Sequence, residues 1–206
     1  YVASKGKPMI LSTGIAEIQD IDLAIETCRK AGNEDITVLK CTSAYPADPT
    51  DANLLTIPDI KKRFRVKAGL SDHTMGIEGA IVATVLGATV IEKHFILDKS
   101  IGGPDAHFSL DEKEFTQMVK SVRIAESMLG KLDYEMTEKK KKSKQFSRSL
   151  FIVSDVKKGD VITKDNVRSI RPGFGLHPKY YNEILGKLFK LDIERGTPLS
   201  FDQIKL

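Results

Sequence analysis

The chain has 206 residues, of which 41% are hydrophobic and 29% are charged, enough to bury the core of one large domain or of one medium and one small domain. The formal net charge is +4, but five lysines stand within residues 139–144, and the rest of the chain is nearly neutral. This charge pattern excludes a dedicated nucleic-acid-binding protein.

The sequence also indicates a cellular setting. Cys28 and Cys41 do not have the spacing of a disulfide framework, which predicts a reducing cytoplasm. No apolar stretch reaches the length of a membrane span, so we expect no membrane partner. The chain begins with Tyr1 rather than Met, and we therefore expect that an N-terminal part is missing.

Along the chain, short apolar strands alternate with amphipathic helices. Each predicted strand ends in small polar residues or a histidine before the next helix begins. The predicted strands are 8–11, 36–39, 64–70 and 89–92, and the predicted helices are 17–31, 54–63, 76–86 and 111–129. Four consecutive strand–helix units predict a parallel sheet with right-handed crossovers.

Two α/β architectures fit this order, an open doubly wound sheet and the C-terminal half of a (β/α)8 TIM barrel. A doubly wound sheet usually has a GxGxxG phosphate loop after its first strand, and this sequence has none. Polar residues instead follow each successive strand, at the rim where a barrel assembles its active site. They are Ser12, Ser43, Ser71 with His73, and His94. This pattern favours the second half of a barrel in residues 1–135.

Past residue 135 the strand–helix pattern ends. The lysine run is typical of a solvated linker, which we place at 136–145. Residues 146–206 have the pattern of strands and turns, which predicts a small, mostly β domain.

The second domain repeats itself. Residues 153–167 align with 190–204 at a constant offset of 37, which indicates a duplicated β unit with Gly159 and Gly196 in equivalent tight turns. Between the copies, segment 171–178 contains two prolines, two glycines and an arginine. It is either an exposed functional loop or a turn that simply needs these residues.

The two histidines at neighbouring strand ends can ligate one divalent ion, with water or substrate oxygen completing its coordination. Alone, His73 or His94 is more typical of a core or turn residue, but as a pair on adjacent strands they favour a metal site. Side chains alternate along a strand, so Ser71 and His73 should share a face. By the same parity Glu92 should accompany His94. Asp72 should turn away and support the site from behind.

Serines at three strand ends lie beside backbone N–H groups that open helices. Such groups together suit a phosphate or a carboxylate. The serines are Ser12, Ser43 and Ser71. His107 and His177 have no comparable position, and His107 is expected in a surface loop.

Taken in order, six motifs resemble the sialic acid synthase family. They are ILSTG, KCTSAYP, GLSDHT, IEKHF, GGPD and RPGFGLHPKYY, and they span essentially the whole chain. The resemblance implies a transferase that condenses phosphoenolpyruvate with an acylamino sugar to a nine-carbon sialic-type acid and releases phosphate. It also implies a β/α barrel followed by a SAF (antifreeze-like) domain, in a domain-swapped homodimer.

Within this family, the details are most similar to the pseudaminic branch, whose substrate is 2,4-diacetamido-2,4,6-trideoxy-altrose. The N-acetylneuraminate and legionaminic branches are the alternatives. The family's phosphate-binding lysines lie on the first four barrel strands, so we expect the 206-residue chain to be inactive by itself. Two other classes stay open: a non-catalytic SAF-containing binding or assembly module, and a metal-dependent aldolase, which would leave the SAF-like tail unexplained.

The resemblance also implies roles for single residues. The metal ligands would be His73 and His94, holding Mn²⁺, with Mg²⁺ or Co²⁺ as alternatives. These two histidines and Asp105 would form the catalytic set. Contacts to phosphoenolpyruvate would come from Ser12, Ser43 and Ser71; contacts to the sugar would come from Tyr45, Asp105 and Phe146, and from Arg171 of the partner's SAF domain.

Overall fold

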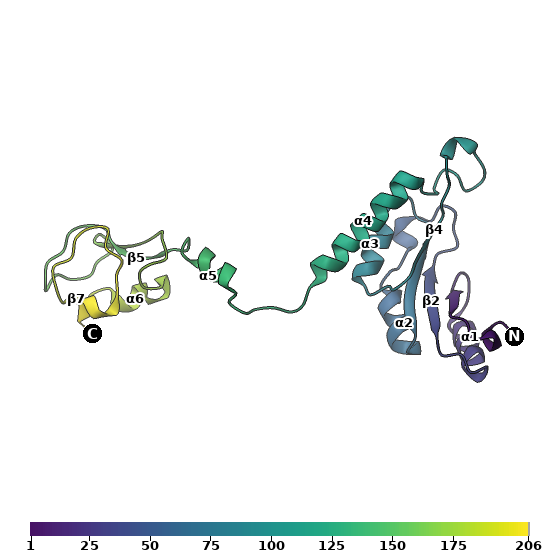
Figure 1. Ribbon diagram of the computed structural model, residues 1–206. Coiled ribbons are helices and arrows are strands. Elements are labelled where there is room, and N and C mark those ends of the chain that lie inside the picture. Colours follow the sequence, from purple (N-terminus) through teal and green to yellow (C-terminus); the bar gives the residue numbers. More distant parts are fainter. Residues whose placement is uncertain (206) are drawn as a thin grey trace. The chain divides into compact units, whose positions relative to one another are not determined.

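The computed structural model describes residues 1–205 and divides into two compact units, Tyr1–Lys131 and Leu132–Leu206 (Figure 1). The expected domain limits, with a linker at 136–145 between them, stay predictions. Among the described residues, no helix combines the length and the apolar character that crossing a membrane requires.

The first unit is built on a four-stranded parallel sheet whose strands follow one another in chain order (Figure 1). The strands are β1 (Met9–Ser12), β2 (Ile36–Cys41), β3 (Lys67–Asp72) and β4 (Ile91–Lys93); the helices are α1 (Ile18–Lys30), α2 (Thr56–Phe64), α3 (Glu78–Val85) and α4 (Glu112–Leu129), with 3-10 turns η1 (Ala3–Lys5), η2 (Pro49–Asp51) and η3 (Lys99–Ile101). A doubly wound sheet reverses its strand order at a switch point, whereas a barrel wall keeps chain order. The α/β class and a curled parallel sheet of the barrel type are therefore confirmed.

The helices cover one face of this sheet with a hydrophobic core. Alternate side chains of β2 and β3 pack there against the buried faces of α1 and α2. The core includes Ile25, Ile36, Val38, Ile57, Ile60, Ala68 and Leu70. Because successive side chains of a strand point to opposite faces, Ser71 lies on the face away from the helices, and so does His73, two positions after it.

The boundary between α2 and β3 differs from the expected one. Phe64 was expected in the third strand, but it is the last residue of α2 and is buried with Ile57 and Ile60. These residues follow helical spacing, so burial of one helix face extends the helix to Phe64. Arg65 then ends the helix in the left-handed region at φ 54°, and β3 runs from Lys67 to Asp72.

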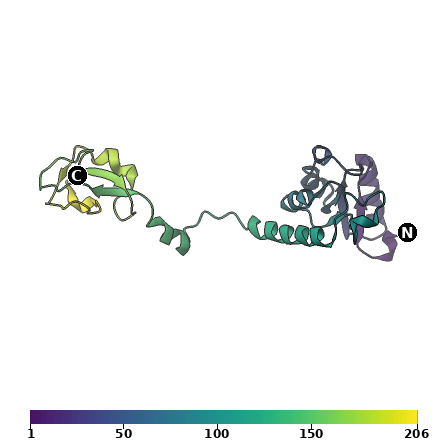
Figure 2. The same ribbon diagram turned by 90° about the horizontal axis from the view of Figure 1, so that it is seen from above.

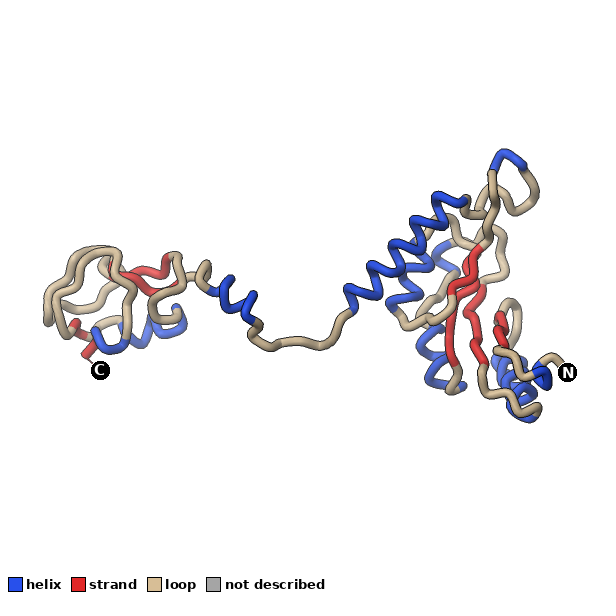
Figure 3. Tube along the Cα trace, in the orientation of Figure 1, coloured by secondary structure: helices blue, strands red, loops and turns tan. Residues whose placement is uncertain are grey.

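The second unit consists of short antiparallel strand pairs joined by long loops (Figures 2 and 3). Its strands are β5 (Ser149–Ile152), β6 (Val167–Ile170), β7 (Leu188–Phe189) and β8 (Ile204–Lys205); its helices are α5 (Glu138–Lys144) and α6 (Tyr181–Ile184), with 3-10 turns η4 (Pro178–Tyr180) and η5 (Phe201–Gln203). The lysine run, expected as a solvated linker, forms the exposed helix α5. The hydroxyl of Thr137 caps it by accepting a hydrogen bond from the Lys140 amide.

The duplicated β unit is confirmed by reciprocal backbone hydrogen bonds. The Gly159 amide donates to the Phe189 carbonyl at 2.9 Å, and the Gly196 amide donates to the Ile152 carbonyl at 2.8 Å. Each donor and each acceptor is displaced by 37 residues from its counterpart, so each copy completes the other. Gly159 and Gly196 adopt φ values of 95° and 90°, which only glycine adopts without strain.

Substitution Gly69→Ala is expected to destabilise the first unit. A Cβ at this position would meet the carbonyl oxygen of Val90 and lie 2.5 Å from Leu39 Cδ2, so the strands would have to move apart. We expect a loss of roughly 1–3 kcal/mol in the free energy of unfolding, measured by denaturant titration. The control Lys61→Ala, on the exposed side of α2, should stay within about 0.5 kcal/mol. Equal stability of the two variants would contradict the close approach.

Substitution Asp192→Asn is expected to change how stability depends on pH. Hydrogen bonds from the Lys158 amide and from the Lys157 ammonium lower the pKa of Asp192 below its ordinary value of 3.8. A lowered folded-state pKa stabilises the fold above pH 3.8 and loses this effect as the pH falls through the folded-state pKa. The variant should therefore melt slightly below the unsubstituted chain at neutral pH, and the difference should shrink in strong acid. A difference independent of pH would contradict this assignment.

Candidate active site

The site is built at the C-terminal ends of β3 and β4, on the face away from the helices. Ser71 is paired with Glu92 in the register of these strands, and the Ser71 hydroxyl donates to Glu92 Oε1 at 2.7 Å. One residue beyond the ladder on each strand, His73 and His94 come together with ring centroids 5.1 Å apart. Strand parity therefore places a serine, a carboxylate and two imidazoles in one group.

One nitrogen of the His73 ring is held by the backbone of the neighbouring strand end. Nδ1 lies 3.0 Å from the carbonyl oxygen of Thr42, which can only accept, so Nδ1 carries the proton. The Cys41 sulfur lies 3.9 Å from the same nitrogen. The ring is only 7% exposed, and its Nε2 keeps a free lone pair.

A carboxylate lies near the His94 ring. The ring's Nδ1 is 3.7 Å from Asp105 Oδ2, which is longer than a hydrogen bond but close enough to favour a proton on Nδ1 over one on Nε2. Backbone pairing fixes this region, because the Leu110 amide donates to the His94 carbonyl at 2.9 Å. Asp105 thus lies beside one of the two imidazoles, and its catalytic role stays a prediction.

Two aromatic rings, those of Tyr45 and Phe108, pack against the imidazoles. The Tyr45 ring lies 4.3 Å from His73 and 6.0 Å from His94, measured between ring centroids. Phe108 lies 4.9 Å from His94 and is 1% exposed. Sequence reasoning did not single out Phe108; the signal was its place after Asp105 in a loop that returns to the rim. His107, beside it, is exposed in this loop as expected.

The residues present fit a divalent metal held by two histidines. Over residues 1–205, no three His, Cys, Asp or Glu side chains gather closely enough to hold an ion by themselves. The fit comes from the free nitrogens: His73 and His94 each direct Nδ1 to an oxygen, the usual arrangement of metal-binding imidazoles. Such a pair leaves the remaining coordination positions to water or substrate oxygen.

The first two strand ends bring further polar groups to the same rim. Ser12 is exposed at the end of β1, and the Ser43 hydroxyl lies 3.9 Å from the Cys41 sulfur. The Cys41 amide donates to Thr13 Oγ1 at 3.0 Å, which joins the two strand ends. Among the described residues, Ser71 is the one of the three serines whose hydroxyl is engaged by a carboxylate, a contact that sequence reasoning did not foresee.

Lys40 braces the strand end that orients His73. Its ammonium donates to the Cys41 carbonyl at 2.9 Å and to Thr42 Oγ1 at 3.2 Å. Burial lowers the pKa of Lys40 below its ordinary value, and the neighbouring Cys41 opposes this change. These bonds hold in place the segment whose carbonyl accepts from His73.

The remaining expected site residues lie in the second unit. Phe146 is 65% exposed just after α5, and Arg171 is exposed at the end of β6. The Gly173 amide donates to the Gln145 carbonyl at 2.8 Å, so the segments carrying the two residues lie side by side.

The loop after β6 is also tightly packed. The Ser149 hydroxyl donates to the Pro172 carbonyl at 2.7 Å and accepts from the Gly175 amide at 2.9 Å. A Cβ on Gly175 would collide with the Leu150 carbonyl. Gly175 is therefore required by the packing of the turn itself, while Arg171 is exposed.

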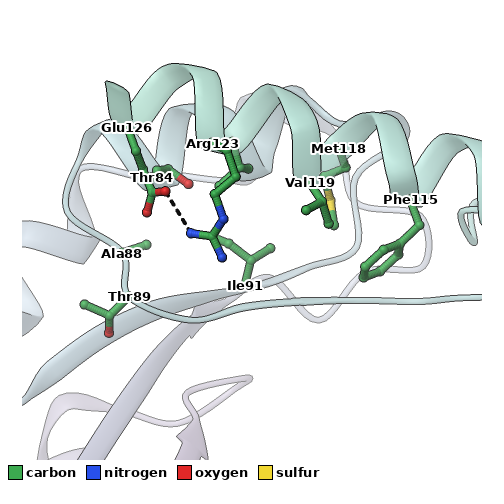
Figure 4. A pocket seen from close by; sticks show the side chains of 10 residues that line it. Thr84, Ala88, Thr89, Ile91, Phe115, Met118, Val119, Arg123 and Glu126 are labelled. Carbon is green, nitrogen blue, oxygen red and sulfur yellow. Dashed lines mark hydrogen bonds and ion pairs between the residues drawn. The ribbon is translucent and has the colours of Figure 1, made fainter. Parts of the chain in front are cut away.

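A separate cavity of about 190 Å³ lies between α3, α4 and the start of β4 (Figure 4). Arg123 extends across it and pairs with Glu126 at 2.8 Å. Its lining combines apolar side chains with two threonines and the Arg123–Glu126 pair, and none of the residues expected in the site contributes to it. The chemistry at the strand ends is therefore distinct from this cavity.

Comparison with known proteins matches two families to different parts of the chain. The profile of the NeuB family matches residues 1–134, and that of the SAF domain matches residues 147–205. The chain is 48% identical over 198 residues to pseudaminic acid synthase of Campylobacter jejuni, covering 96% of this chain and 58% of that protein. It is 46% identical over 200 residues to pseudaminic acid synthase of Helicobacter pylori, covering 97% of this chain and 59% of that protein.

A solved structure agrees in fold. The spore coat polysaccharide biosynthesis protein SpsE of Bacillus subtilis matches with a TM-score of 0.61 and 34% identity, over 100% of this chain and 63% of that chain. The chain thus spans about three fifths of the length of the proteins it matches. The resemblance to the sialic acid synthase family is confirmed, and the chain belongs to the NeuB family.

Proposed function

We propose that the protein containing this chain is a pseudaminic acid synthase, a transferase that condenses phosphoenolpyruvate with 2,4-diacetamido-2,4,6-trideoxy-altrose. C3 of phosphoenolpyruvate bonds to the aldehyde carbon of the sugar, water adds at C2, and phosphate leaves with cleavage of the C–O bond. The observation that carries the proposal is the pair His73 and His94, with ring centroids 5.1 Å apart at neighbouring strand ends in a chain of this family.

In this proposal the four strands of the chain are four of the eight of a (β/α)8 barrel, and the whole reaction belongs to the complete protein. Support comes from the chain-order parallel sheet and from a rim that carries chemistry at every strand end. The proposed setting is the cytoplasm, where the free thiols of Cys28 and Cys41 stay reduced.

The chain's own residues would divide the work at the rim. A divalent ion bound by His73 and His94, with Mn²⁺ as the first choice, would polarise the sugar aldehyde as a Lewis acid. Asp105 would orient His94. Tyr45 would border the sugar and, with Phe108, exclude water from the imidazoles.

The serines would hold phosphoenolpyruvate. Ser12, Ser43 and Ser71 stand at successive strand ends, where hydroxyl donors suit a phosphate or a carboxylate. Ser71 already donates to Glu92, so substrate binding at this serine would share or replace that bond. The reacting carbon would then lie next to the imidazole pair.

The second unit would complete the site from a partner subunit in a domain-swapped homodimer. Arg171 and Phe146 lie on adjoining segments and are both exposed, as side chains that cover a neighbour's substrate must be. A guanidinium can hold a planar anionic group in two places, and an aromatic ring can cover an apolar part of the sugar.

Phosphate release is the direct test of this function. The complete protein, given phosphoenolpyruvate, Mn²⁺ and the altrose-type sugar, should release one phosphate for each sugar consumed, and the 206-residue chain alone should release none. The legionaminic and mannosamine-type sugars serve as comparisons for the branch. Absence of phosphate with every amino sugar would overturn the synthase assignment and favour a binding module; cleavage of the acid without phosphoenolpyruvate would favour an aldolase.

Removal of the ligands tests the metal site. His73→Ala and His94→Ala should each lower the Mn²⁺ affinity at least tenfold and kcat at least 100-fold, because neither remaining imidazole holds the ion alone. Isothermal titration with Mn²⁺ measures the affinity. The control His107→Ala, in the exposed loop, should leave both quantities unchanged. Mn²⁺ binding that survives loss of both histidines would contradict the site.

A further inference from the structure

A buried ion pair joins β3 and β4 on the side opposite the candidate site. Lys93 Nζ lies 2.8 Å from Asp72 Oδ2, and the two side chains are 0% and 2% exposed. This pair is shielded from water. In each of the other ion pairs among the described residues, at least one of the two side chains is a third or more exposed. It has no part in the chemistry described so far.

The pair stands where the backbone ladder between the two strands ends. Asp72 and Lys93 are register partners and are the last residues of β3 and β4. The next residue on each strand is His73 or His94. No ladder bond beyond this point joins the two strands in the described residues, so the ion pair is the last link between them before the imidazoles.

The carboxylate is fixed on every side. Asp72 Oδ1 accepts from the Thr74 amide at 2.9 Å and from the Thr74 hydroxyl at 2.8 Å, while Lys93 also donates to the Thr74 carbonyl. Helix α3 packs closely above, because a Cβ on Gly79 would lie 2.8 Å from Asp72 Oδ2. The pair therefore locks both strand ends, the following turn and the start of α3 into one arrangement.

Stability alone is a weak explanation for such a pair. Taking two charges out of water costs about as much as their attraction returns, and apolar residues of similar volume often serve stability equally well. Fixing a register or a geometry is the better supported role of buried ion pairs.

We propose that Asp72 and Lys93 are positioning residues that set the spacing of the His73 and His94 rings. Each member precedes one imidazole in the chain, and because side chains alternate, the pair and the imidazoles occupy opposite faces. A shift of either strand end would move one ring relative to the other. Where the proposed metal site is correct, this spacing lets both Nε2 atoms reach one ion, and its loss should weaken metal affinity tenfold or more.

The test removes both charges together. The double variant Asp72→Asn/Lys93→Met keeps the approximate shapes and leaves no unpaired buried charge. One readout needs no metal: the nuclear Overhauser effect between the ring protons of His73 and His94, assigned by its disappearance in His73→Ala and in His94→Ala. The other is Mn²⁺ affinity by isothermal titration.

A matched control lies at the other end of the same strand. Lys67 Nζ pairs with Asp35 Oδ1 at 2.8 Å, with side chains 61% and 50% exposed. Asp35→Asn/Lys67→Met removes the same two charges from β3 and its neighbour without touching the rim. Both readouts should stay at their unsubstituted values in this variant.

We expect the double variant at the rim to fold, to lose the ring-to-ring Overhauser effect and to bind Mn²⁺ at least tenfold more weakly. An unchanged Overhauser effect or an unchanged affinity in the folded variant would overturn the proposal. If the double variant does not fold, Lys93→Arg, which keeps both charges but changes the length and shape of one side chain, decides by the same readouts. An intact Overhauser effect with no Mn²⁺ binding in the unsubstituted protein would instead contradict the proposed metal site.

Discussion

The link between β3 and β4 is the constraint on which the candidate site depends. On two successive register pairs of these strands, Ser71 bonds to Glu92 on one face and Asp72 pairs with Lys93 on the other. Because side chains alternate along a strand, the two contacts lie on opposite faces of the sheet. The buried pair fixes the spacing of the strands on the helix side, and this spacing sets the positions of the polar side chains on the opposite face. The imidazoles then project one residue beyond, where the loops after both strands converge.

The fold and the rim were largely predictable because both follow from periodicity. Alternation of apolar residues located the parallel strands, and chemistry at each strand end placed Ser71 and His73 on a common face with His94 nearby. The local sequence pattern could not predict that Phe64 belongs to helix α2 and not to the third strand, since its burial depends on α2 packing against the sheet. Phe108 was not predicted as a site residue, because it lies in a loop that returns to the rim and loops have no periodic sequence pattern.

In the second unit, too, a regular sequence pattern predicted part of the structure and left another part open. A sequence repeat of 37 residues predicted equivalent turns at Gly159 and Gly196, and the reciprocal hydrogen bonds show why the repeat exists: neither copy closes its turns without the other. The same sequence left the role of the segment around Arg171 open. Gly175 is explained by its packing against Leu150 and Gly173 by its packing against Lys144 and Ser147, while Arg171 is exposed.

We propose that two imidazoles on adjacent strand ends hold one divalent ion. Pulsed electron paramagnetic resonance of Mn²⁺ bound to the complete protein tests it most directly, because imidazole nitrogens bonded to the ion couple to its electron spin. We expect couplings from two nitrogens, reduced to one when either His73 or His94 is replaced by alanine. A bound Mn²⁺ with no nitrogen coupling, or with couplings that persist without these histidines, would contradict the claim.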